Sequence, residues 1–316
     1  MNEKKPIIVF QSDFTRKEGA VSSMYGVVKS VDRELEIFDG THEIPHFDTW
    51  SASYRLYQSL RFWPKGTVYV SVVDPGVGTD RKACVAQTND GYFIVTPDNG
   101  TLTHIKHYVG IKQVREIDER TNRLRGKETE DVAIFHGRDV FAYTAARLAS
   151  GIIDFKGTGA EYPVEQIVTH PIFEPRVFPK RVEGIFEIGD PNFGNLWTNI
   201  PLSDFKSAGF NFGDTILIKV IRQDLKNFAF NTDKQNERSS GAIESESEEQ
   251  NASLLLLEKP ALFCKSFGYA PKGSLVIYNN EIGRIAVAVT QGNLCQTYSL
   301  DYGANIKVIF ESPKEK

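Results

Sequence analysis

The chain has 316 residues, of which 41% are hydrophobic and 25% charged, and its formal net charge is −4. This length predicts two domains rather than one small core. The slightly acidic balance, without clustered basic residues, argues against nucleic acid as the main partner. No apolar stretch near the start is long enough for a signal peptide or a membrane span, so we expect a cytoplasmic protein that does not bind membranes. The three widely spaced cysteines predict neither a disulfide framework nor a zinc knuckle.

Strand and helix patterns alternate in the first half of the chain. Apolar runs predict strands at residues 7–10, 35–38 and 68–73, with helices at 21–31 and 51–62 between them. This alternation is typical of a mainly parallel sheet with flanking helices, an α/β domain. Further predicted elements are a hairpin of strands 83–88 and 92–96 around Asn89-Asp90-Gly91, and a last helix at 138–150.

The pattern changes after a Pro- and Gly-rich stretch at residues 157–180, so we predict an N-terminal domain at 1–165 and a C-terminal domain at 166–316. Frequent turns and short strands in the second domain indicate a small antiparallel β-barrel or sandwich. A polar, acidic stretch at 231–253 is typical of a solvated loop insertion. The predicted strands are 181–188, 196–200, 215–221, 254–257, 275–278, 285–289 and 306–309.

The most informative string is Val72-Val73-Asp74-Pro75-Gly76-Val77-Gly78-Thr79-Asp80-Arg81. Asp74 directly follows an apolar strand, and a Pro/Gly-rich turn brings back the guanidinium of Arg81. Sites in α/β sheets are built at this end of the strands. A carboxylate fixed by an arginine can orient or polarise a water, although a hairpin turn with a structural ion pair has the same pattern.

Asp13 follows the first predicted strand and Glu18 comes shortly before the first predicted helix. A carboxylate at this strand end can accept hydrogen bonds from a ribose diol, but it can equally cap the following helix.

His42, Glu43 and His46 have the order of a helical zinc motif. Pro45 and the strand-end context exclude the helix which that motif needs, so we expect no metal site.

Two further groups contain chemically useful side chains. His136 stands between Phe135 and Gly137, just before a predicted helix. It is either a structural hydrogen-bonding residue or a group that acts as a general acid or base or holds a water, and the glycine permits close approach of a ligand or another chain segment. In the second domain, Asp190, Asn195 and Trp197 surround a Gly turn. They could bind an ammonium group and a purine, or form a plain β-turn beside a core tryptophan.

Six ordered motifs give the chain a resemblance to the S-adenosyl-L-methionine hydroxide adenosyltransferases, a family related to bacterial fluorinase and chlorinase. The match covers nearly the whole chain. The motifs are Ser12-Asp13-Phe14, Thr41-His42-Glu43-Ile44-Pro45, Val73-Asp74-Pro75-Gly76-Val77-Gly78, Thr96-Pro97-Asp98-Asn99-Gly100, Phe135-His136-Gly137-Arg138-Asp139 and Phe193-Gly194-Asn195-Leu196-Trp197-Thr198-Asn199.

The resemblance implies an N-terminal α/β domain plus a C-terminal β-barrel domain, in a homotrimer with each site between two subunits. It also implies hydrolysis of S-adenosyl-L-methionine to adenosine and L-methionine, without a metal or another cofactor. The implied water-activating residues are Asp74, Arg81 and His136. The implied substrate-binding residues are Asp13 for the ribose, Phe47 and Phe135 as aromatics, Glu18 and Asp190 for the methionine end, and Asn195 and Trp197 for the adenine side.

Some positions depart from the family pattern. Thr15 stands where a glycine is usual, Glu18 replaces an aspartate, and Glu281-Ile282-Gly283 replaces a segment that holds the substrate carboxylate. In the halogenating relatives the position of Asp74 is a tyrosine, and an anion here repels a halide. Two alternatives stay open: a protein that binds adenosine or S-adenosyl-L-methionine without catalysis, and a halogenase.

Overall fold

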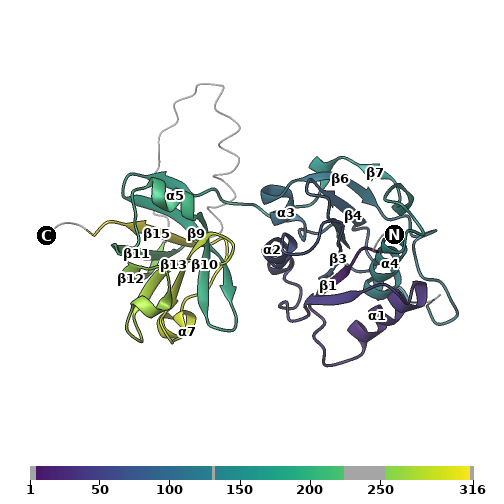
Figure 1. Cartoon of the computed structure of the whole chain (residues 1–316), viewed down its shortest axis with the longest axis horizontal. Helices are drawn as coiled ribbons and strands as arrows, with labels where there is room; N and C mark the ends of the chain where they lie inside the picture. Colours follow the sequence, from purple (N-terminus) through teal and green to yellow (C-terminus); the bar gives the residue numbers. More distant parts are fainter. Residues whose placement is uncertain (1–4, 130–131, 224–252, 314–316) are drawn as a thin grey trace, which may run out of the picture. The chain divides into compact units, whose positions relative to one another are not determined.

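The computed structural model describes residues 5–129, 132–223 and 253–313, and the chain divides into two units at residues 1–171 and 172–316 (Figure 1). The predicted insertion at 231–253 lies, except for Ser253, outside the described residues. No helix in the described part of the chain is long and apolar enough to cross a membrane.

The first unit is built on a seven-stranded sheet with the order β2-β1-β3-β5-β4-β6-β7. Strands β2, β1, β3 and β5 are parallel, whereas β4 is antiparallel to both of its neighbours and β6 pairs antiparallel with β7. The strands are β1 (Ile8–Ser12), β2 (Ile37–Thr41), β3 (Val68–Val72), β4 (Ala83–Thr88), β5 (Phe93–Pro97), β6 (Ile111–Glu116) and β7 (Glu161–Tyr162). The prediction of a mainly parallel sheet is therefore confirmed.

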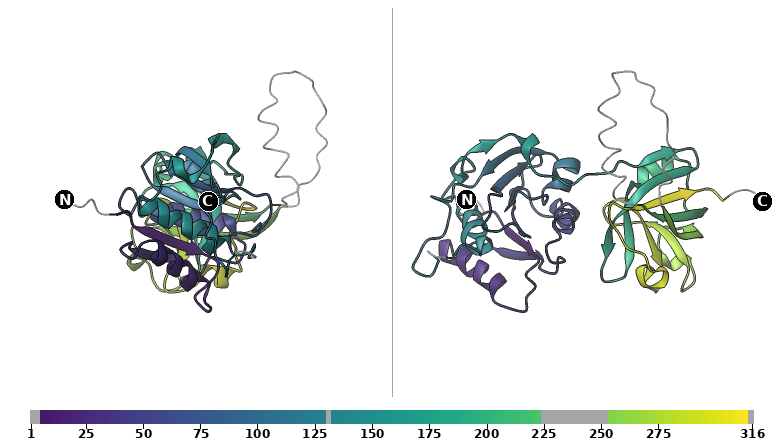
Figure 2. Two further views of the ribbon diagram at one scale, coloured as in Figure 1. Left: turned by 90° about the vertical axis from the view of Figure 1, so that its right-hand side faces the viewer. Right: turned by 180° about the vertical axis from the view of Figure 1, so that it is seen from behind.

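Helices cover both faces of this sheet (Figure 1 and Figure 2). Phe10 of β1 packs against Tyr25 of α1, while the side chain of the next residue, Gln11, donates to the Ala52 carbonyl of α2 at 2.8 Å. Successive side chains of a strand point to opposite faces, so α1 and α2 lie on opposite sides. The helices are α1 (Ala20–Val31), α2 (Thr49–Leu60), α3 (Thr103–Tyr108), the π-helix η1 (Gly137–Ala142), α4 (Tyr143–Ala149), and the 3-10 turns η2 (Lys156–Thr158) and η3 (Val164–Gln166).

The predicted helix at 138–150 exists, but it begins as the π-helix η1. Gly137 opens it and packs tightly against its surroundings: a Cβ there would lie 3.2 Å from the Phe14 ring and 3.3 Å from Met24 Sδ. The close approach that we expected from this glycine is therefore an approach of other chain segments, among them α1. π turns of this kind recur at functional sites, and this one starts directly after His136.

The second unit is a closed seven-stranded β-barrel. Its ring runs β9-β10-β14-β13-β12-β11-β15 and closes by the β10–β9 pairing, with β8 added beside β9. All of these pairs are antiparallel except β12–β13. The elements are β8 (Arg176–Phe178), β9 (Arg181–Asp190), β10 (Asn195–Pro201), α5 (Leu202–Ser207), β11 (Thr215–Arg222), β12 (Leu254–Phe263), η5 (Phe267–Tyr269), β13 (Leu275–Asn279), β14 (Arg284–Val289), α7 (Leu294–Tyr298) and β15 (Ile306–Glu311).

Apolar side chains fill the inside of the barrel, where Phe205 contacts the rings of Phe210, Phe263 and Phe310. Along β10, Leu196 belongs to this core, whereas Asn195 and Trp197 do not. The strand alternation thus sends these two predicted site residues to the outer face, where both are nevertheless buried.

Candidate functional site

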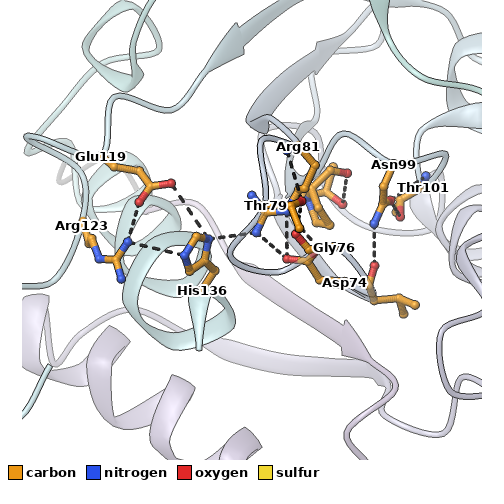
Figure 3. Close-up of polar contacts among 12 residues, drawn as sticks. Asp74, Gly76, Thr79, Arg81, Asn99, Thr101, Glu119, Arg123 and His136 are labelled. Carbon is orange, nitrogen blue, oxygen red and sulfur yellow. Dashed lines mark hydrogen bonds and ion pairs between the residues drawn. The ribbon is translucent and has the colours of Figure 1, made fainter. Parts of the chain in front are cut away.

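Asp74 and Arg81 form a closely held ion pair at the end of β3. Arg81 Nε donates to Asp74 Oδ1 at 2.9 Å and to Oδ2 at 3.1 Å, and Arg81 Nη2 donates to Oδ2 at 2.5 Å (Figure 3). Their side chains are 5% and 10% exposed, respectively. Gly76 allows the turn to fold back on itself, because a Cβ there would lie 3.2 Å from Arg81 Cγ. The geometry therefore fixes a carboxylate at the strand end.

His136 extends this pair into a three-residue network. Its Nδ1 lies 2.9 Å from Arg81 Nη2, which can only donate, so Nδ1 accepts and the ring is neutral. Burial lowers the pKa of His136, and the guanidiniums of Arg81 and Arg123 lower it further, while Glu119 and Asp74 act in the opposite direction. At neutral pH the imidazole is thus an acceptor that orients Arg81.

Asn99 steadies the other side of the Asp74 loop: its Nδ2 donates to the Val73 carbonyl at 2.9 Å, and its Oδ1 accepts from Thr101 Oγ1 at 2.8 Å (Figure 3). The side chain of the neighbouring Asp98 makes a different set of contacts. It accepts from Tyr162 Oη and from the Val168 backbone, both at 2.9 Å, and burial raises its pKa. The motif at 96–100 therefore supports the strand end rather than adding a reactive group to it.

Asp13 lies at the same edge of the sheet, since Ser12 pairs with Val72, the residue two before Asp74. It is buried, and its Oδ2 accepts from the backbone N–H of Phe47 at 2.9 Å. Phe47 has φ +65° and is 69% exposed. The left-handed backbone of a bulky residue is unusual and here presents an aromatic surface beside a carboxylate.

The first loop also shows where this chain departs from its expected pattern. Thr15, which stands in place of a glycine, has φ +56°, the backbone conformation that glycine adopts most easily. Glu18 is exposed, and its Oε1 accepts from the Ala20 N–H at 3.0 Å at the start of α1. Phe135 packs edge-on against Phe14 with 5.9 Å between ring centroids.

His42 is a structural residue in this arrangement. Its Nδ1 shares a 2.7 Å hydrogen bond with Ser12 Oγ, and its Nε2 lies 3.0 Å from Asp39 Oδ1 and 3.1 Å from Tyr25 Oη. Burial, reinforced by Arg16, lowers the pKa of His42 to about 4. Within the described ranges, no group of three or more His, Cys, Asp or Glu side chains is arranged to hold a metal ion.

In the second unit, Asp190 and Asn195 stand at the two ends of the turn between β9 and β10. Asp190 Oδ1 accepts from the backbone of Asn192 at 3.1 Å and of Phe193 at 3.4 Å, and its Oδ2 lies 3.4 Å from Asn195 Nδ2. Gly194 has φ +67° and makes room for Asn293, whose side chain would lie 2.1 Å from a Cβ there. This turn requires glycine on both grounds.

Trp197 donates its Nε1–H to Tyr278 Oη at 3.1 Å. Burial raises the pKa of Tyr278 to about 12, so the phenol keeps its proton and can act as a donor as well. Tyr278 is a polar residue that sequence reasoning missed, because no motif marks it. The structure joins Trp197 to Tyr278, and Asp190 to Asn195.

The segment Glu281-Ile282-Gly283 forms the turn between β13 and β14. Asn280 Oδ1 accepts from the backbone of Ile282 at 3.1 Å and of Arg284 at 2.9 Å, and Gly283 has φ +80°. Glu281 is exposed on this turn. Asn280 thus stabilises this turn, and Glu281 places an exposed acid on it.

Comparison with known proteins agrees with the motifs. Models of the SAM hydroxide adenosyltransferase N-terminal and C-terminal domains, SAM being S-adenosyl-L-methionine, match residues 8–159 and 239–307. The (R)-S-adenosyl-L-methionine hydrolase of Methanocaldococcus jannaschii is 34% identical over 68% of this chain and 73% of its own length. The hydrolase of the same name from Salinispora tropica is 28% identical over 96% of this chain and 97% of its own.

More distant similarity extends to halogenating enzymes and to a solved structure. The fluorinase of Actinopolyspora mzabensis is 22% identical over 96% of this chain and 97% of its own. The crystal structure of an uncharacterized conserved protein from Thermotoga maritima superposes with a TM-score of 0.78 at 29% identity, covering 96% of this chain and 99% of that one. Both domain models and the identity to the Methanocaldococcus protein show that this chain belongs to the SAM hydroxide adenosyltransferase family.

Proposed function

We propose that this protein hydrolyses S-adenosyl-L-methionine at its 5′-carbon and releases adenosine and L-methionine. The observation that carries the proposal is the Asp74–Arg81 pair at the end of β3, in a chain of this family. The relatives named (R)-S-adenosyl-L-methionine hydrolase support the same reaction.

The reaction mainly requires the protein to position a water molecule. The oxygen of a water forms a bond to the 5′-carbon while the carbon–sulfur bond breaks, so the sulfonium leaves as the neutral thioether of methionine and one water proton is released. The leaving group is already activated by its charge, and the main requirement is a water held in line with the carbon–sulfur bond. Asp74 accepts a hydrogen bond from this water, Arg81 fixes Asp74, and His136 fixes Arg81. No cofactor enters the scheme.

The substrate contacts follow from the side chains and the family pattern. Asp13 receives a ribose hydroxyl, with Phe47 and Phe135 as the aromatic surfaces beside the nucleoside. Glu18 and Asp190 face the ammonium group of the methionine end, and Asn195 and Trp197 serve the adenine. The protein is also proposed to be cytoplasmic. The family pattern further suggests a homotrimer with sites shared between subunits, and light scattering of the purified protein tests the trimeric state.

Two other functions are distinguishable. A halogenase is the weaker candidate despite the fluorinase similarity, because the carboxylate of Asp74 repels a halide. A protein that binds the nucleoside without turnover is favoured by Glu281, whose charge opposes the substrate carboxylate.

Liquid chromatography of S-adenosyl-L-methionine incubated with the protein, with and without fluoride or chloride, separates the three. Adenosine formation supports the hydrolase, a 5′-halogenated adenosine identifies a halogenase, and unchanged substrate despite binding in calorimetry identifies a binding protein. The variant Asp74→Asn is the control, because it should remove adenosine formation above the spontaneous background.

A further inference from the structure

Two further residues, Arg123 and Glu119, lie next to His136, which belongs to the proposed water-activating group of Asp74, Arg81 and His136. Arg123 Nη1 lies 2.7 Å from Glu119 Oε2 and 3.5 Å from His136 Nε2 (Figure 3). Arg123 Nη2 donates to the Val132 carbonyl at 2.7 Å. We propose that Arg123 is a positioning residue that holds His136 as a neutral acceptor for Arg81, that Glu119 opposes it, and that these two residues together adjust the pH at which His136 takes up a proton. This inference rests on the function proposed above.

The distances around the ring define its protonation state. Both ring nitrogens of His136 face an arginine, and a neutral imidazole can accept through only one of them. The contact of Nδ1 with Arg81 is 2.9 Å and that of Nε2 with Arg123 is 3.5 Å, so Nδ1 is the acceptor and Nε2 carries the proton. Arg123 therefore acts on the ring by its charge rather than as a hydrogen-bond donor.

The charges around His136 come from two loops. The β3–β4 loop provides Asp74 and Arg81, and the segment between β6 and η1 provides Glu119 and Arg123. Glu119 Oε1 lies 4.0 Å from His136 Nδ1, where its negative charge favours the imidazolium. Arg123 favours the neutral ring and also holds Glu119 through its other oxygen.

The neighbouring residues of the π-helix add no net charge. On the π-helix itself, Arg138 and Asp139 pair with each other at 2.6 Å. The next residue, Gly137, packs against the apolar side chains of Phe14 and Met24. Besides Arg81 and Asp74, the charges that act on His136 are therefore those of two opposed residues of one segment, Glu119 and Arg123.

Protonation of His136 would disturb the Asp74 site directly. A proton on Nδ1 would point at the Arg81 guanidinium, so the 2.9 Å hydrogen bond would be lost and two cations would repel. Arg81 would then lose a group that orients it, and its guanidinium would hold Asp74 in a less defined position. Activity should therefore fall on the acid side of a pH profile, at the pH where His136 takes up a proton.

Opposite shifts of this acid limb test the proposal. In Arg123→Met the free Glu119 carboxylate favours the imidazolium, so the limb of kcat should move up by about one pH unit, with near-normal kcat in alkaline buffer. In Glu119→Gln it should move down. Arg120→Met is the matched control, because Arg120 belongs to the same segment but is 88% exposed and pairs with Asp118. It should leave the profile unchanged.

Conservative replacement and a direct titration complete the experiment. Arg123→Lys keeps the positive charge and should retain the wild-type limb, whereas an equal loss of kcat at every pH in Arg123→Met would indicate a purely structural role and overturn the proposal. Shifts of Arg123→Met and Glu119→Gln in the same direction would also overturn it.

NMR titration of the His136 ring, assigned by its absence in His136→Asn, reads the same protonation without substrate. It therefore decides the inference even if the protein does not hydrolyse S-adenosyl-L-methionine. Opposite displacements of this titration in the two variants support the proposal, and unchanged titration in both contradicts it. If Arg123→Met does not fold, as judged by circular dichroism, Glu119→Gln and Arg123→Lys decide alone.

Discussion

The polar groups of the two units are held very differently. In the first unit, Asp74 receives three arginine contacts of 2.5 to 3.1 Å, and the arginine is itself held by His136 at 2.9 Å. In the second unit, Asp190 and Asn195 meet at 3.4 Å, on a turn whose neighbour Phe193 is 66% exposed. Short charge-assisted contacts fix an orientation before the ligand arrives, whereas long contacts leave room for adjustment. We therefore expect residues of the first unit to control turnover and those of the second to control substrate affinity.

Asp74→Ala should have the largest effect. Because Asp74 faces the water in the proposed reaction, we expect kcat to fall by about 100-fold or more while nucleoside binding stays within about tenfold. Steady-state kinetics and calorimetry with adenosine measure the two quantities. Asp80→Ala is the matched control, since Asp80 is an exposed acid on the same loop. Retained hydrolysis in Asp74→Ala would remove Asp74 from the mechanism.

Arg81→Lys should lower kcat by about tenfold or more, with a smaller change in KM. The planar guanidinium of Arg81 contacts both carboxylate oxygens of Asp74 and also Nδ1 of His136. The ammonium of a lysine cannot reproduce this arrangement of donors. Arg120→Lys, at an exposed site, should behave as the unmodified protein. A change in KM alone in Arg81→Lys would contradict the expectation that residues of the first unit control turnover.

The sequence predicted the Asp74 site better than its surroundings because the pairing with Arg81 is local. A Pro/Gly turn returns the arginine after seven positions, and this return is visible in the string itself. Glu119 and Arg123 were not predicted, since their contact with His136 depends on how the segment after β6 folds back. Tyr278 lies 81 positions from Trp197, and only the barrel register brings them together.

The same reasoning explains which elements were predicted. Strands β1 and β3 are buried along their whole length and therefore read as continuous apolar runs. Strand β6 has exposed charged positions, among them Lys112 and Glu116, and α3 has six residues, so neither produced a clear period. The helix at 138–150 was predicted from the stretch that follows His136-Gly137, but its π-helical start depends on packing around Gly137.

Asn195→Ala tests the expectation that residues of the second unit control substrate affinity. We expect KM to rise by about tenfold with little change in kcat, because loss of the proposed hydrogen bond from Asn195 to the adenine would affect ground state and transition state alike. Asn192→Ala is the control, as Asn192 is exposed on the same turn and uses its backbone N–H to contact Asp190. A fall in kcat with unchanged KM would show that the barrel takes part in positioning the reaction.

Tyr278→Phe should have the smallest effect on catalysis, because it changes the stability of the barrel rather than kcat. It removes the acceptor of the Trp197 Nε1–H, which is buried, and leaving such a donor without a partner costs about 1–3 kcal/mol. Thermal unfolding should therefore begin a few degrees lower, while the exposed ring of Tyr269 provides a matched control in Tyr269→Phe. Unfolding at the wild-type temperature, together with a rise in KM as large as that of Asn195→Ala, would instead make Tyr278 a ligand-binding group. Trp197 would then owe its orientation to the substrate rather than to the barrel.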